Sequence, residues 1–220
     1  MMTDWGQLTP VLWLSFQQTV YMVFWTMLIA GLLGLALGVA LYATRRGRLL
    51  QNAPAFHVLN VLVNIIRPIP FIIFITAVGP LTLLVMGTTI GTRSVLFPMS
   101  AMATFFIGRI VEQNLVSVDP GVIEAARSMG ASRFRIIWSV LVPEALGPLI
   151  LGYTFIFVAV VDMSAMAGYV GGGGLGNFAI SYGYQQFNWP VTLVTVVIII
   201  VIVQVAQLLG NWLARRALHR

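Results

Sequence analysis

Five long apolar stretches constrain this chain more than any other feature of its sequence. A helix needs roughly 20 mostly apolar residues to cross about 30 Å of hydrocarbon. Because a bilayer core holds no water to satisfy backbone polar groups, such stretches must form helices or a closed barrel. They are continuously apolar and do not alternate with polar residues, which favours helices. We therefore predict an all-α polytopic membrane protein with five transmembrane helices, at residues 20–43, 56–85, 94–110, 146–170 and 191–213.

The composition agrees with a surface that mostly does not face water. Charged residues make up 8% of the chain and the mean hydropathy is +0.95, whereas soluble domains contain about 25% charged residues. The first stretch is too long for a signal-peptide core and follows Asp4 instead of a basic segment, so we expect it to remain in the mature protein. We find no internal repeat and no second domain, and we predict a single transmembrane permease domain over residues 1–220.

The positions of the arginines predict the orientation of the chain. All twelve basic residues are arginine, and ten of them follow the first, third or fifth stretch. Basic residues accumulate on the cytoplasmic side of a membrane, so the N-terminus should lie outside and the C-terminus inside. A net charge of +6 then needs no nucleic acid as a partner. The ten are Arg45, Arg46, Arg48, Arg109, Arg127, Arg133, Arg135, Arg215, Arg216 and Arg220.

Arg67 fits two positions. The Arg67–Pro70 break interrupts the second stretch, and Gly79-Pro80 interrupts it again. If the first break ends an interfacial helix, Arg67 lies at the cytoplasmic face; if the second span is continuous, Arg67 is buried midway.

One long polar insert, residues 112–144, separates the third and fourth stretches. Asp119 is predicted to cap a short helix, and the proline after it suits the first helical position. Gly130 should supply the turn that ends this helix, Ser132 should cap a second one, and Pro143 should end it. The first helix is too short to be stable alone in water. Either a partner packs on it, or the insert is an ordinary connecting loop.

The insert resembles the EAA loop of ABC importer permeases. That motif is written EAA-x3-G-x9-I-x-L-P, and here Glu124-Ala125-Ala126, Gly130 and Pro143 occupy its positions, with valine at the two aliphatic positions before the proline. In that family the loop forms a coupling helix, between spans three and four, that docks on the ATPase subunit. The resemblance therefore implies that Glu124, Ala125, Ala126, Gly130 and Pro143 couple this chain to an ATPase.

Further segments are similar to the methionine-uptake subfamily of these permeases. They are Arg67–Phe71, Gly108–Asn114, Ser164–Gly168, Gly171–Gly176 and Tyr182–Gln186, and the resemblance runs from about Thr19 to Arg216. It implies import of an amino acid, D- or L-methionine or a related one. The implied assembly contains two copies of this chain, two ATPase subunits and an external substrate-binding protein, in the plasma (inner) membrane of a bacterium. In that subfamily the position of Met166 lies at the gate of the translocation path, which implies a path role for Met166 and its neighbour Ser164.

The glycine run from Gly171 to Gly174 does not predict a nucleotide site. A phosphate-binding P-loop needs a Gly-Lys-Ser/Thr sequence, and this chain has no lysine. We predict no cofactor in this chain, with ATP and Mg²⁺ bound by the partner ATPase. The run is instead predicted to be a flexible turn at the outer end of the fourth span, where glycine permits positive φ angles and close helix approach.

Asp162 is an unusual residue for a transmembrane span. Counting about 1.5 Å per residue from Leu149 places it roughly 20 Å into the apolar slab, where a carboxylate costs about 2.5–3.5 kcal/mol. It should therefore contact the substrate ammonium group or an ion, pair with Arg67 or Arg93, or stay neutral through burial. We assign Asp162 and Arg67, with Met166 and Ser164, to the path.

Two other classes of function remain to be weighed. An ion-coupled secondary amino-acid carrier using Asp162 is the alternative, and it predicts inverted repeats, which we do not find. A membrane enzyme needs reactive groups in a recognisable set. The sequence has no cysteine, no paired carboxylates and no cluster with metal-ligand spacing, so we predict no catalytic residue and no metal site.

Overall fold

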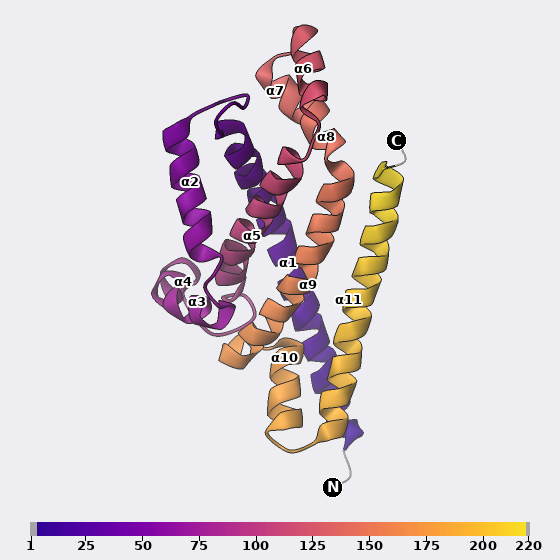
Figure 1. Cartoon of the computed structure of the whole chain (residues 1–220). Coiled ribbons are helices and arrows are strands. Elements are labelled where there is room, and N and C mark those ends of the chain that lie inside the picture. The colour runs from indigo at the N-terminus through magenta and orange to yellow at the C-terminus, as the bar shows by residue number, and fades with distance from the viewer. Residues whose placement is uncertain (1–3, 219–220) are drawn as a thin grey trace. The chain divides into compact units, whose positions relative to one another are not determined.

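The computed structural model describes residues 4–218, which form helices and contain no strand (Figure 1). The prediction of an all-α protein is confirmed for this part of the chain. Arg220, one of the arginines used for orientation, lies outside the described residues.

Among residues 4–218, three helices are long and apolar enough to cross a membrane. They are α1 (Trp5–Thr44), α9 (Leu146–Ala167) with the π-helical turn η2 (Gly168–Gly172), and α11 (Trp189–Leu218). A fourth is counted if α2 (Ala53–Ile66) and α3 (Phe71–Ala77) together form one broken span.

The other predicted spans differ from their expected bounds. The second stretch is divided into α2, α3 and α4 (Gly79–Met86), so both predicted breaks exist. Pro68 and Pro70 have no N–H to donate and restrict the residues before them, which ends α2 at Ile66. The third stretch becomes α5 (Leu96–Val116), which continues into the predicted polar insert. α5 is less apolar than the three spanning candidates because its second half carries charged side chains.

The chain groups into two compact units. Unit 1 comprises Met1–Ile29, Ile69–Ala103 and Phe157–Ala206; unit 2 comprises Ala30–Pro68, Thr104–Ile156 and Gln207–Arg220. Helices α1, α5, α9 and α11 each contribute residues to both units.

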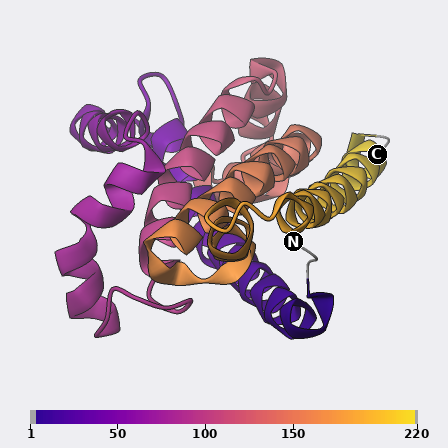
Figure 2. The same ribbon diagram turned by 90° about the horizontal axis from the view of Figure 1, so that it is seen from below.

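In unit 1, the end of α9 leads through the turn η2 into α10 (Gly174–Phe178) and η3 (Ala179–Tyr184). Figure 2 shows this segment, in orange, beside the N-terminal part of α1. Two side chains of α1 accept hydrogen bonds from the first backbone N–H groups of α10. Gln18 Oε1 accepts from Gly174 N at 2.7 Å, and Thr19 Oγ1 accepts from Leu175 N at 2.8 Å.

The loop before α5 holds the same glycine run. Gly91 N donates to Gly171 O at 3.0 Å, and the Thr92 hydroxyl donates to Gly172 O at 3.0 Å. The φ angle of Gly171 is +92°, in the left-handed region that glycine adopts without strain. The run contains a turn, as predicted. It differs from the predicted flexible turn because hydrogen bonds from α1 and from this loop hold its backbone.

In unit 2, the insert folds into a short helical hairpin. It consists of α6 (Pro120–Ser128) and α7 (Arg133–Ile136), followed by the π-helical turn η1 (Ile137–Leu141) and the single turn α8 (Val142–Glu144). α6 and α7 project beyond the N-terminal end of α9 (Figure 1). We call α6 and α7 the coupling hairpin.

Candidate coupling surface and transport path

The ends of the coupling hairpin follow the predicted capping pattern. The Asp119 carboxylate accepts a hydrogen bond from Gly121 N at 2.8 Å, and α6 starts at the proline between them. Gly130 has a φ angle of +80°, so it forms the left-handed turn that ends α6. Ser132 Oγ accepts from Arg135 N at 3.4 Å and caps α7. The sequence therefore predicted the start of both helices and the end of the first.

The prediction that Pro143 ends the second helix is wrong. Pro143 lies inside α8, the chain stays helical through Glu144, and Ala145 is the capping residue before α9 begins. Proline is tolerated in the first turn of a helix because its missing N–H has no partner there. The π-helical turn η1 precedes α8 and supplies the irregularity that accommodates the ring.

The small residues of α6 do not share one environment. Glu124 and Ala125 are exposed, whereas Ala126 is 3% exposed and lies with Ile123 on the buried face. Ala126 therefore packs inside this chain, and a bulky side chain at this position would disturb the hairpin itself. Ala125 is the alanine that a partner could contact.

Sequence reasoning missed large apolar side chains that the hairpin and its continuation expose. Met129 is 81% exposed, Phe134 66% and Trp138 53%. Apolar side chains grouped on a surface mark interaction sites more often than single ones do. The signal available in the sequence was their presence inside an otherwise polar insert, next to Gly130. We define the coupling surface as Glu124, Ala125, Met129, Gly130 and Phe134.

A buried ionic network lies in unit 2. Glu112 is 2% exposed, and its carboxylate accepts from the guanidinium of Arg109, three residues earlier on α5. A spacing of three residues puts the two side chains on one face of the helix, where such pairs form. Arg45 lies 3.6 Å from the other carboxylate oxygen of Glu112. Arg109 also donates to the side-chain oxygens of Asn60 and Asn64 on α2, at 2.7 Å each. The network therefore joins α2, α5 and the segment after α1, which fixes the base from which the hairpin extends.

The predicted path residues of α9 separate into two environments. Asp162 and Met166 are exposed and, four residues apart, share one face of the helix. Tyr169, which sequence reasoning missed, continues this face and is 66% exposed. Ser164 is buried, and its hydroxyl donates to the carbonyl of Val161 at 2.6 Å. The exposed face of α9 in unit 1 therefore presents a carboxylate, followed along the helix by the apolar side chain of Met166 and, after α9 ends, by the aromatic ring of Tyr169.

Asp162 has no ionic partner among the described residues of unit 1. Both ion pairs found in the described residues involve Glu112, so Arg93, which belongs to the same unit, does not pair with Asp162. Arg67 belongs to unit 2, where its guanidinium lies 5.8 Å from the centre of the Phe106 ring. Its Nε atom is buried without a hydrogen-bond partner among these residues.

Two glycines bring the end of α9 and the start of α10 into backbone contact. A Cβ atom on Gly176 would lie 2.3 Å from the carbonyl oxygen of Ala165, and one on Gly168 would lie 2.6 Å from the backbone nitrogen of Asn177. Only glycine fits such positions because the opposing atoms belong to backbone. This contact sets where the exposed face of α9 ends.

Three features together define a membrane-embedded transport component. They are the apolar helices long enough to span a membrane, the projecting hairpin with its exposed apolar side chains, and the carboxylate on an exposed helix face. A family model described as "Binding-protein-dependent transport system inner membrane component" matches residues 34–219. The chain belongs to this family and is an inner-membrane transport protein.

Individual relatives give a finer comparison. The chain is 44% identical over 203 residues to a probable D-methionine transport system permease protein MetI of Vibrio cholerae, which covers 92% of this chain and 90% of the relative. It is 41% identical over 171 residues to the methionine import system permease protein MetP of Bacillus subtilis. The match covers 78% of this chain and 77% of that relative. A solved structure of the MetNI methionine ABC transporter in an inward-facing conformation contains a similar chain. That chain has a TM-score of 0.94 and 36% identity, with 98% of this chain and 99% of the other covered.

Proposed function

We propose that this chain is the transmembrane permease subunit of an ATP-binding-cassette importer for methionine. The observation that carries the proposal is similarity over 98% of the chain, with a TM-score of 0.94, to a chain of a methionine ABC transporter. The permeases of Vibrio cholerae and Bacillus subtilis, both named for methionine, support the same solute. The chain is then a transport subunit and not an enzyme, and ATP and Mg²⁺ are bound by a separate ATPase.

The proposed assembly contains two copies of this chain, two ATPase subunits and an external substrate-binding protein. The coupling surface contacts an ATPase, with Pro143 in the helix that supports it. The exposed face of α9, with Asp162 and Met166, lines the path. A carboxylate facing lipid would cost about 2.5–3.5 kcal/mol, so this face is better placed against a polar path than against acyl chains. The proposal keeps two further residues for the path, Ser164, which is buried on α9 in unit 1, and Arg67, which belongs to unit 2.

We further propose five spans, with the N-terminus outside and the C-terminus inside. The arginine distribution supports this topology, and it puts the coupling hairpin in the cytoplasm. Reporter fusions after Arg48, after Ser132 and at the C-terminus should all report cytoplasm, and a fusion after Phe187 should report the exterior. An external signal at Ser132 would contradict both the topology and the assignment of the coupling surface.

Substitution of Ala125 tests the coupling surface. Ala125→Trp should abolish most methionine uptake and reduce co-purification of the ATPase, because an exposed small side chain in a docked helix leaves no room for an indole. Overfilling of this kind costs about 1–3 kcal/mol. The measurements are uptake of labelled methionine in cells and the amount of ATPase retained by the purified chain.

Ala53→Trp is the matched control, since Ala53 is also an exposed helical alanine but lies at the start of α2. Ala53→Trp should keep both methionine uptake and co-purification of the ATPase. If Ala125→Trp also kept both, the coupling surface would be assigned wrongly. Methionine uptake by vesicles that contain this chain and no ATPase would contradict the importer and favour an ion-coupled carrier.

A further inference from the structure

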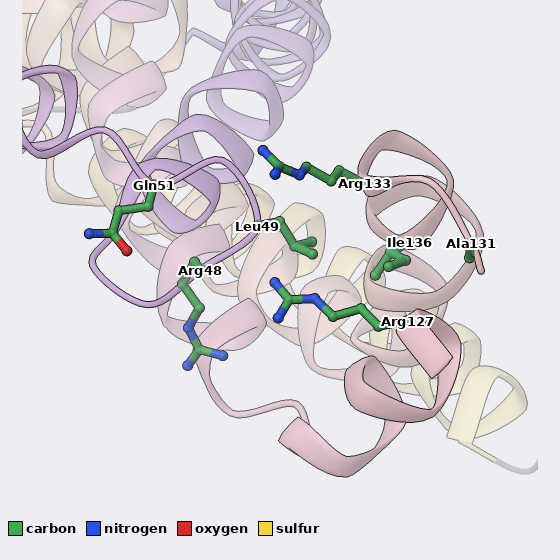
Figure 3. Close-up of a pocket in the computed structure, with 7 residues that line it drawn as sticks. All are labelled: Arg48, Leu49, Gln51, Arg127, Ala131, Arg133 and Ile136. Carbon is green, nitrogen blue, oxygen red and sulfur yellow. The ribbon is translucent and has the colours of Figure 1, made fainter. Parts of the chain in front are cut away.

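A cationic cavity lies beside the coupling hairpin in unit 2. Its volume is about 560 Å³, within the range of small-ligand pockets. Figure 3 shows Arg127 and Arg133 extending from the hairpin toward the loop that carries Arg48 and Leu49. The described residues that line it are Arg48, Leu49, Gln51, Arg127, Ala131, Arg133 and Ile136, and none of them is acidic.

The three guanidinium groups are not neutralised by this chain. Arg48 donates to the Tyr42 hydroxyl at 3.0 Å and lies 4.8 Å from the centre of its ring, so it is anchored by a neutral partner. Within the described residues, the side chains of Arg127 and Arg133 make no hydrogen bond and no ion pair, and both residues are exposed. Glu124 does not line this cavity; it lines an adjoining one of about 80 Å³ with Arg48 and Arg127. The larger cavity therefore gathers three positive charges from a loop and both hairpin helices with no counter-ion.

We infer that this cavity binds a phosphate group. Guanidinium groups donate paired hydrogen bonds to the oxygens of a phosphate, and these charge-assisted bonds are among the strongest in proteins. Leu49 and Ile136, which are 3% and 1% exposed, add an apolar side to the cavity. Such a lining suits a phosphate that carries a carbon substituent.

The place of the cavity in the chain points to two sources of this group. Arg48 follows the end of the apolar helix α1 at Thr44 by four residues, so it lies where a spanning helix leaves hydrocarbon. Basic pockets at this level bind the head groups of anionic lipids. A soluble phosphate compound offers the same chemistry. From either source, the group would bridge the loop after α1 to the coupling hairpin and restrain the hairpin.

The test uses the full chain purified with its ATPase in zwitterionic detergent. Native mass spectrometry measures binding of short-chain phosphatidylglycerol, of phosphatidylcholine of the same length as the net-neutral comparison, and of inorganic phosphate. The triple variant Arg48→Gln, Arg127→Gln and Arg133→Gln should bind the phosphate probe more weakly, by about tenfold for each arginine removed.

The matched control replaces Arg46, Arg135 and Arg215 with glutamine. It removes the same charge from residues that do not line the cavity, and it should keep the wild-type affinity. If the triple variant does not assemble, Arg127→Gln and Arg133→Gln are tested singly, because neither side chain makes a hydrogen bond or an ion pair within the described residues.

Binding of phosphatidylglycerol alone supports a lipid head group, and binding of inorganic phosphate as well supports a soluble phosphate compound. Equal loss of binding in the cavity variant and in the charge-matched control would overturn the inference, since it would reflect net charge alone. No binding of any probe by the wild type would also overturn it. Unchanged probe binding with loss of the ATPase would assign the three arginines to the subunit contact instead.

Discussion

Gly176→Ala is expected to prevent unit 1 from reaching its native packing. The added Cβ atom would lie 2.3 Å from the carbonyl oxygen and 2.5 Å from the Cα atom of Ala165. Neither atom belongs to a side chain that can rotate away, so α9 and α10 must separate. Overpacking costs about 1–3 kcal/mol and occasionally more. Separation would also pull α10 from Gln18 and Thr19, which accept hydrogen bonds from its first residues.

The measurements are the yield of folded chain and its thermal unfolding in detergent. Gly79→Ala is the matched control, because no described atom lies within 4 Å of the position its Cβ would take, and its φ angle is not positive. At such a site alanine should be neutral or stabilise by about 0.4–1 kcal/mol. Equal stability of Gly176→Ala and wild type would show that the backbone contact between α9 and α10 is absent in the membrane.

Asp162→Asn should lower methionine uptake at least about tenfold, since a hydrogen bond to a charged group contributes about 1.5–3 kcal/mol. The proposed solute carries an ammonium group, and Asp162, which has no ionic partner among the described residues of unit 1, presents its carboxylate on the exposed face of α9 that also carries Met166. The purified variant should assemble with the ATPase and unfold at the wild-type temperature. Uptake of labelled methionine and thermal unfolding are measured together. Substitution of a path residue lowers uptake, whereas substitution of a structural residue lowers the unfolding temperature.

Asp4→Asn makes the same chemical change at an exposed carboxylate outside the path, and it should leave uptake unchanged. A lower unfolding temperature of Asp162→Asn would instead indicate an ionic partner within the assembled transporter. If adding Arg67→Gln or Arg93→Gln to Asp162→Asn restored the unfolding temperature, that arginine would be the partner. If Asp162→Asn kept both the wild-type uptake and the wild-type unfolding temperature, the assignment of Asp162 to the path would be wrong.

The sequence by itself determined the features that depend on neighbouring residues. Continuous apolar stretches predicted the helices, Pro68 and Pro70 predicted the break after Arg67, and Gly79-Pro80 predicted the second break. Asp119 and Ser132 predicted the starts of the two hairpin helices, and Gly130 predicted the end of the first. Each of these depends on hydrogen bonds or steric limits within a few residues, which the order of side chains specifies.

The structure differs from the sequence prediction at two helix boundaries that the apolarity of the residues does not indicate. α1 begins at Trp5 although its predicted span begins near residue 20, since adding residues to a helix that is already formed is easier than starting one. The helix after Ser132 continues through Pro143 because a π-helical turn precedes it. Neither the start of α1 nor this turn leaves a periodic signal in the sequence.

Only the tertiary structure decided which side chains face a partner and which face the chain. Ala125 and Ala126 are adjacent and chemically identical, yet packing buries Ala126 and leaves Ala125 exposed. Likewise, Arg48 is distant in sequence from Arg127 and Arg133, and the three meet around one cavity. The physical reason is that burial depends on the direction in which each side chain leaves its helix and on what packs there. Segments far apart in the sequence supply those neighbours, and the local order of residues does not encode them.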